Sequence, residues 1–588
     1  MNIKKIVKWI LVIASIGIVY PPCCSIFTEA VHHLETFFHT HGDYDQLRRT
    51  FPIFDSALEA KGMIPADAAI DFSPAQWNLY RVSARYSLYP HETSKNWRYF
   101  IDFSKNFNPD PGWKSYILST GVLVFAKAGN EIQRNKSSLP PTYPTAQNFF
   151  IFMFMVIYQC WLGSYVLKWL KISRSENPCW YWGTSYLLGF LVLTLLLWIF
   201  LLVGGEMTKE SMTVLCVIVG FLFKILAAKP SCPTRTSVFI KDPPNSLTRA
   251  LQIFSILIIA AIFASAVFNV VNDWDAMSNW IMKAKVMHYH KRLDFAYTHH
   301  NYYPILWPLN IALQFTFADG FYDEMAQWTS GLFFLLIVIQ LKYGLACLRT
   351  SVKVQWFTIF LYLVFSQYLI DFTTANAENI FVAFLFLLII LLIKWLEDSS
   401  NAYWQRGIVL AATGLVLIKL EGTVAILLII FTLLSLYQKF PFKKDLGGCV
   451  LGIAITLPLG FLWTFWIKYH GYLNGIVHLQ EGLSWNKLCT ILKFDFLVFL
   501  RSPLCIILLF AVLYFILYPN RRRFNLVELF LLRLSILLMC FSTFAYFGLP
   551  TEQIEGAFHH AFPRLFMHAA PPLVLLWASR AGVANLEC

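Results

Sequence analysis

Long apolar stretches, separated by short polar segments, run from residue 147 almost to the end of the chain. Most are close to the roughly 20 residues that an α-helix needs to cross a bilayer. The stretch 408–437 is too long for one span and is interrupted by Lys419 and Glu421, so we expect a hairpin with its apex at 419–422. The other predicted spans are residues 147–170, 179–203, 210–228, 249–271, 327–347, 354–371, 377–396, 446–468, 490–518, 527–548 and 565–580.

The first 145 residues follow a different pattern. An apolar stretch behind Lys4 and Lys5 predicts a membrane anchor, whereas the residues after it are polar and contain no run of spanning length. Strands are expected at 68–72, 97–103 and 116–127 and a helix at 75–88. The predicted fold is an all-α polytopic membrane protein of about 14 membrane helices with a small N-terminal extracytoplasmic α/β domain. We expect the units to be 1–20 (anchor), 21–145 (soluble domain), 146–248 (additional membrane helices) and 249–588 (membrane core).

Composition narrows the class of protein. Of the 588 residues, 57% are hydrophobic and only 14% are charged, against roughly a quarter charged in soluble proteins. The net charge of +13 does not indicate nucleic-acid binding, because the basic residues lie in short clusters between apolar runs, such as 521–523. Placing Lys4 and Lys5 inside puts every basic cluster on the cytoplasmic side, provided that 304–319 does not fully cross. We therefore expect a multi-pass protein of the bacterial inner membrane.

The predicted outer loop 272–304 carries two closely spaced carboxylates, Asp273 and Asp275, at its start. Carboxylates held just beyond the membrane surface act as a general base or bind a divalent cation. The alternative is structural, with Asp273 capping a helix and Asp275 pairing with a nearby lysine. No set of ligands in the sequence demands a metal, so a divalent cation is left open.

Cations in the same loop break the positive-inside rule. Lys283 and Lys285 lie on the side where basic residues are scarce, which indicates an anionic partner such as a phosphate. Tyr303 fits both an interfacial aromatic belt and a ring that stacks on a sugar. His299 and His300 are read as solvated histidines, because an adjacent pair lacks the i, i+4 spacing of a helical metal site.

Three further segments end on the same predicted face. Lys419 and Glu421 form either a functional pair or a salt bridge that closes the hairpin. Glu378 begins a span, where a carboxylate is also favoured by the helix dipole. Arg564 and His568 share a helical face, and Arg564 either captures a phosphate or extends to lipid head groups.

Residues 274–285, with 303–308, 418–423 and the final outer segment 559–572, resemble loops of bacterial GT-C membrane glycosyltransferases of the dolichyl-phosphate-mannose-protein-mannosyltransferase-like kind. The resemblance covers about residues 249–580. It implies that Asp273 or Asp275 activates the acceptor, and that basic residues receive the phosphate of a polyprenyl-phosphate sugar donor. Many relatives carry an aspartate near Glu378, and the domain at 21–145 is not a standard feature.

These observations predict a glycosyltransferase that moves a sugar from a polyprenyl-phosphate donor to a glycan, lipid or protein acceptor on the periplasmic side, with membrane lipid around it and no nucleic acid. Two alternatives remain. A transporter or flippase of lipid-linked sugars gains weight if Lys419 and Glu421 lie deep in the membrane. A non-catalytic scaffold predicts that the outer-loop carboxylates are dispensable.

Overall fold

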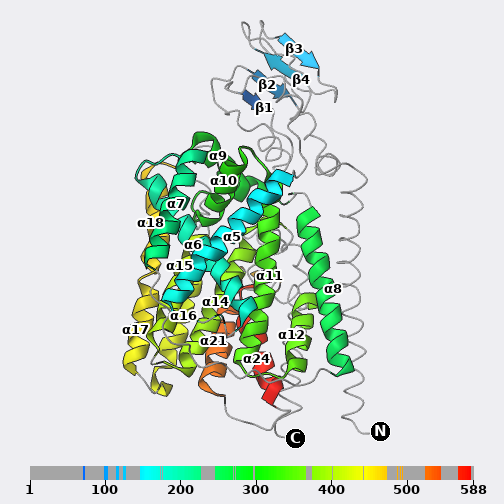
Figure 1. Ribbon diagram of the computed structural model, residues 1–588, viewed down its shortest axis with the longest axis vertical. Helices are drawn as coiled ribbons and strands as arrows, with labels where there is room; N and C mark the ends of the chain where they lie inside the picture. The colour runs from blue at the N-terminus through cyan, green and yellow to red at the C-terminus, as the bar shows by residue number, and fades with distance from the viewer. Residues whose placement is uncertain are drawn as a thin grey trace.

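The computed structural model describes most of the chain from residue 146 onward, and before that residue only the backbone of four short strands (Figure 1). Beyond residue 145 the description omits residues 173, 175–176, 227–244, 269–270, 272, 274, 296–297, 299, 366–373, 400, 441–442, 473–486, 488–489, 492, 494–523, 545–566 and 584–588. The predicted anchor, the predicted helix at 75–88 and most of the predicted span 490–518 lie outside the described residues.

The four strands confirm the strand predictions with one correction. β1 (Ile70–Phe72) pairs in parallel with β2 (Tyr99–Asp102), which pairs antiparallel with β4 (Leu123–Ala126). The single strand expected at 116–127 was wrong, because β3 (Lys114–Ile117) and β4 form an antiparallel pair in which Ile117 faces Leu123. The sequence Ser119-Thr120-Gly121 between them is rich in turn-forming residues.

From residue 146 the described chain is helical. The helices follow the predicted apolar stretches, and most boundaries agree within a few residues. They are α5 (Ala146–Trp169), α6 (Pro178–Leu202), α7 (Lys209–Leu226), α8 (Ser246–Phe268), η1 (Ala276–Ile281), α9 (Met282–His290), α10 (Leu306–Ala318), α11 (Asp323–Cys347), α12 (Val352–Phe365), α14 (Ala377–Glu397), α15 (Ala402–Ile418), α16 (Leu420–Ser435), η2 (Tyr437–Lys439), α17 (Lys443–Ala454), α18 (Leu457–Tyr469), α21 (Leu526–Phe544) and α24 (Ala570–Val583).

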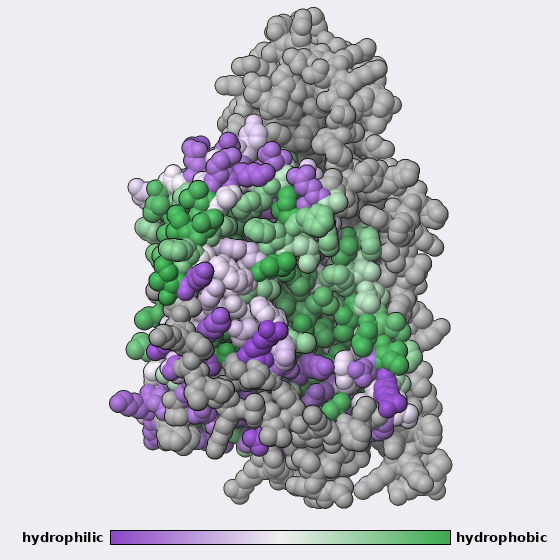
Figure 2. All heavy atoms as spheres, viewed as in Figure 1, coloured by the Kyte–Doolittle hydropathy of each residue, from purple (hydrophilic) through white to green (hydrophobic). Residues whose placement is uncertain are grey.

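Six helical stretches of the described chain are long and apolar enough to span a membrane: α5, α6, α8, α11, α14 and the α17–α18 stretch. Many large apolar side chains on their outer faces are exposed, including Phe150 on α5 and Phe254 on α8. A protein in water rarely exposes so much apolar surface, whereas lipid covers it without cost. In Figure 2 hydrophobic residues gather over α8 and over α7 and α18, and hydrophilic residues gather toward the ends of the bundle.

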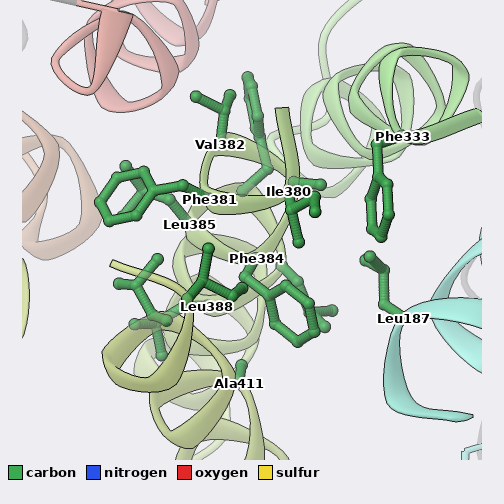
Figure 3. Packing of buried hydrophobic residues seen from close by; sticks show 14 of the residues in the cluster. Leu187, Phe333, Ile380, Phe381, Val382, Phe384, Leu385, Leu388 and Ala411 are labelled. Atoms are coloured by element: carbon green, nitrogen blue, oxygen red, sulfur yellow. The ribbon is translucent and has the colours of Figure 1, made fainter. Parts of the chain in front are cut away.

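The core of the bundle is built around α14, which is buried along nearly its whole length. Figure 3 shows Phe384 of α14 with Leu187 of α6 and Phe333 of α11 nearby, and Ala411 of α15 on another side of the same helix. Because α14 carries apolar residues on all sides, it is stable only when other helices surround it. Its first turn is thereby held inside the bundle.

Close backbone contact joins α5 to α6. A Cβ atom added to Gly163 would lie 1.7 Å from the carbonyl oxygen of Ser185, and one added to Gly189 would lie 1.8 Å from that of Gln159. Small residues allow membrane helices to approach this closely, since lipid offers no hydrophobic force to drive them together.

The predicted hairpin and the predicted short segment are both present as helices. α15 ends at Ile418, α16 begins at Leu420, and Lys419 joins them in an extended conformation with φ −145° and ψ 154°. α10 has 13 residues, which gives roughly 20 Å of helix, too short for a bilayer core of roughly 30 Å. Nearly all of its side chains are buried by neighbouring helices, as a segment that does not cross the membrane requires.

Candidate functional site

Asp273 and Asp275 have different surroundings. Asp273 Oδ1 accepts a hydrogen bond from the backbone N–H of Ala276 at 2.9 Å, which caps the start of η1. Asp275 makes no capping bond, and its charge acts on His300, Tyr302 and Tyr303. Asp273 therefore acts as the helix cap that the structural alternative expected, whereas Asp275 belongs to a larger cluster.

The helix that follows Asp275 begins as a π-helix. All six residues of η1 are buried, and the helix continues directly into α9. π-Helical turns are rare and frequently mark functional sites, because the extra residue per turn changes where side chains point. Nothing in the sequence pattern predicted this feature.

Lys283 lies in the middle of the cluster and is only 1% exposed. Its ammonium donates to Asn279 Oδ1 at 2.6 Å and to the carbonyl oxygen of His300 at 2.8 Å. It also lies 5.4 Å from the ring centroid of Trp280. Burial lowers the pKa of Lys283 well below its usual range, because the site excludes water and the two oxygen atoms that accept from the lysine are neutral.

His300 and two tyrosines form the wall beside Lys283. The hydroxyl of Tyr302 lies 3.3 Å from His300 Nδ1, and the rings of Tyr302 and Tyr303 are 4.5 Å apart. His300 has a positive φ of 50°, a conformation that histidine adopts more readily than most residues. Burial lowers the pKa of the His300 imidazole, while the charge of Asp275 opposes this shift. Burial also raises the pKa of the Tyr303 hydroxyl.

The apex of the hairpin adds charged residues to the cluster. Lys419 Nζ lies 2.8 Å from Glu378 Oε1 and 3.3 Å from Glu421 Oε1. The same ammonium lies 5.7 Å from the ring centroid of Tyr303, and Lys283 lies 5.9 Å from it. Tyr303 is therefore the ring that both lysines approach.

His568 belongs to the same cluster although it is distant in sequence. Its ring lies 4.1 Å from that of Phe381, and the charges of Lys419 and Glu378 act on it. Among the described residues, His568 Nε2 and Glu421 Oε2 are buried and have no hydrogen-bond partner. Each is an open polar position that a polar ligand group could fill.

The depth of this cluster follows from α11. Asn379, next to Glu378, donates to Ser330 Oγ at 2.5 Å. Ser330 lies seven residues after Asp323, where the 25-residue helix begins. A helix rises 1.5 Å per residue, so the cluster lies roughly 10 Å along a helix of roughly 37 Å. It is recessed from one end of the bundle but does not reach its middle.

Two of the predicted site residues that the structure describes, Asp273 and Lys285, do not join the cluster. Lys285 lies 3.0 Å from Asp323 Oδ2 and instead ties α9 to the start of α11. Arg564 lies outside the described residues, as does His299. The cluster comprises the predicted residues Asp275, Lys283, Tyr303, Glu378, Lys419, Glu421 and His568. Its further members are Asn279, His300 and Tyr302.

Sequence reasoning overlooked some of these members. Asn279 precedes Lys283 by four residues, and this i, i+4 spacing could have identified it as a partner. The sequence left a divalent cation open. The described residues contain no group of three or more His, Cys, Asp or Glu side chains that could hold a metal ion.

The chain is a multi-pass membrane protein by the length and hydropathy of its helices. No protein-family model, curated protein or solved structure matches it.

Proposed function

We propose that this protein is a membrane glycosyltransferase that moves a sugar from a polyprenyl-phosphate donor to an acceptor on the extracytoplasmic side of a bacterial inner membrane. The observation that carries the proposal is the convergence of Asp275, Lys283 and Lys419 around Tyr303, from segments far apart in the chain. The GT-C resemblance described above supplies the class of reaction. The geometry supports it by placing a carboxylate, two ammonium groups and aromatic rings together.

In the proposed reaction Asp275 takes the proton from an acceptor hydroxyl. The acceptor oxygen then bonds to the anomeric carbon, and the bond from that carbon to the phosphate oxygen breaks. The leaving phosphate keeps the electron pair, and Lys283 and Lys419 stabilise its developing charge in a site that excludes water. An incoming phosphate favours the charged form of Lys283 and so opposes the effect of burial on the pKa of this lysine.

Aromatic rings give the site its second element. The ring centroid of Tyr303 lies 5.3 Å from that of Trp280 and 4.5 Å from that of Tyr302. Such rings pack against the apolar face of a sugar while the carboxylate and hydroxyl groups bind its polar edge. The open atoms of Glu421 and His568 are suited to sugar hydroxyls, which both donate and accept hydrogen bonds.

The test is sugar transfer in proteoliposomes, using a panel of polyprenyl-phosphate sugars and comparing wild type with Asp275→Asn. We expect the variant to lose at least a hundredfold in rate, the lower range for removing a general base. Asp319→Asn is the matched control. It removes a carboxylate from a residue with φ 56°, a conformation that asparagine tolerates. Full activity in Asp275→Asn would reject the assignment of the base, and no transfer by wild type from any donor would reject the proposal.

Transport of a lipid-linked sugar is the second candidate. The buried group of Glu378, Lys419 and Glu421 favours it, because ionisable residues within membrane helices often lie on substrate pathways. Against transport, the cluster lies well short of the middle of α11, whereas transporter sites lie near the middle of the membrane. This position favours a transferase site that opens to one side. Movement of a fluorescent lipid-linked sugar across a proteoliposome membrane, without any change to the sugar, would favour the transporter.

A further inference from the structure

A second cluster of cations and aromatic rings lies at the other end of the bundle. Lys171 Nζ lies 4.4 Å from the ring centroid of Tyr403, and the guanidinium of Arg406 lies 5.2 Å from the same ring. Arg406 is also 5.2 Å from the ring of Trp169. We call these four residues the Tyr403 cluster. It joins the end of α5 to the start of α15, and α15 runs from there to the candidate site at Lys419.

The cations of this cluster differ from those of the candidate site in their ion pairing. Among the described residues two rings receive two cations each, Tyr303 in the candidate site and Tyr403 here. Beside Tyr303, Glu378 and Glu421 neutralise Lys419. No ion pair involves Lys171 or Arg406 in the part of the chain that the structure describes, so the two cations lie beside one ring without a described carboxylate within 4.0 Å of either.

The backbone adds positive potential at the same place. Tyr403 lies in the first turn of α15, where the N-terminal end of the helix dipole is positive. The side chain of Asn401 caps this turn by accepting from the N–H of Tyr403 at 3.1 Å. Two cations and a helix start therefore face one small region of the surface.

The membrane determines which anion is nearby. Trp169 ends a candidate span and is 47% exposed, as expected for a tryptophan at the level of the lipid head groups. Exposed apolar side chains continue along α5 toward the middle of the bundle, among them Ile157 and Trp161. A lipid meets both parts of this surface, with its phosphate beside the cations and its acyl chains along α5, whereas free phosphate gains nothing from the apolar part.

We propose that the Tyr403 cluster binds the head group phosphate of an anionic phospholipid. This site is separate from the proposed transfer site and does not depend on it. Arginine suits bidentate contact with phosphate oxygens, and Lys171 adds a point charge beside the same ring. Bound lipid joins α5 to α15 and so anchors the base of the hairpin.

The experiment compares retention of phosphatidylglycerol by the full-length protein in detergent, measured by native mass spectrometry. The variant is Lys171→Asn with Arg406→Gln. Asparagine is used because Lys171 has a φ of 53°, which asparagine tolerates. The matched control is Lys342→Gln with Lys443→Gln, which removes two cations that each lie on a ring of their own, Trp356 and Tyr437.

We expect wild type and the control to retain one phosphatidylglycerol more than the cluster variant, and the affinity of that lipid to fall roughly thirtyfold when both charges are lost. Phosphatidylcholine binding should be equal in all three proteins. Excess inorganic phosphate should not displace the lipid. If the control lost as much phosphatidylglycerol as the cluster variant, the loss would be due to the total surface charge and not to this site, and the proposal would be overturned. Unchanged retention in a cluster variant with wild-type thermal stability would also overturn it.

Discussion

The ammonium of Lys419 lies 2.8 Å from the carboxylate of Glu378, although 41 positions separate the two residues and both are nearly inaccessible to solvent. Glu421 lies 3.3 Å from the same ammonium. One cation therefore holds two carboxylates together inside the bundle, and this arrangement makes the lysine more important for stability than either acid.

Replacing the lysine should destabilise the protein more than replacing Glu378. Lys419→Met leaves two neighbouring carboxylates without their cation, and we expect a loss of about 3–5 kcal/mol. Glu378→Gln leaves Lys419 paired with Glu421 and should be milder. The double variant Lys419→Met with Glu378→Gln should recover part of the loss in thermal unfolding in detergent. Arg292→Gln is the control and should change stability by less than about 1 kcal/mol, because the side chain of Arg292 is 69% exposed and water screens its charge.

Substitutions of Asp273 and Asp275 should have different effects, the first on stability and the second on sugar transfer. Asp273→Ala removes the cap of η1 and should lower stability by about 1 kcal/mol, whereas Asp273→Asn should restore both stability and sugar transfer because asparagine also caps helices. Asp275→Asn should keep wild-type stability and lose transfer. Thermal unfolding and initial transfer rates measured on the same samples decide the matter. Loss of transfer in stable Asp273→Asn would show that Asp273 is more than a cap.

Stability should fall when the pH drops below neutrality, in part because of His300. Burial lowers the pKa of His300 in the folded protein from its ordinary value of 6.5, so the unfolded chain takes up its proton first. The stability from this group is complete above pH 6.5 and is lost as the pH falls toward the lowered value. His300→Gln should therefore flatten the decline between neutral and mildly acidic pH. His288, whose pKa is also lowered by burial, contributes in the same direction, and an unchanged slope in His300→Gln would contradict the assignment.

The contact between α5 and α6 should tolerate no side chain at its closest points. Gly189→Ala places a methyl group against the backbone of Gln159, and we expect a loss of about 1–3 kcal/mol. Gly448→Ala is the control, because no atom lies within 4 Å of the added Cβ, and it should be neutral or slightly stabilising. A Gly189→Ala protein that unfolds at the wild-type temperature would mean that the two helices readily move apart.

The hydrophobic pattern predicted the helices because the period and length of apolar runs are local properties. It also placed Lys419 at a hairpin apex, since a charge within an apolar run must either be paired or mark a turn. The pattern could not predict that Lys285 pairs with Asp323, which lies 38 positions away on another helix. Lys283, two residues earlier, points to nearly the opposite side of α9, because a helix turns about 100° per residue. Which neighbour each lysine meets is set by packing.

For residues far apart in the sequence, the sequence could predict only that they lie on the same side of the membrane. Topology placed Glu378, Lys419 and His568 on one side of the membrane, but a shared side does not give contacts within a few ångströms. The role of Asp273 could be narrowed to two alternatives because capping and catalysis both use a carboxylate at a helix start. Only the bond from Ala276 N–H to Asp273 separates these alternatives.

The single-residue connection between α15 and α16 also bears on how the chain enters the membrane. Helices of 17 and 16 residues are each marginal as independent spans, so the pair would insert together, with Lys419 leading into the hydrocarbon. Glu421 lies two positions away in the same leading turn and can cross beside it as a pair without net charge. Glu378, made earlier in synthesis, would then bind the lysine on arrival, and the charged apex would be locked into its final position.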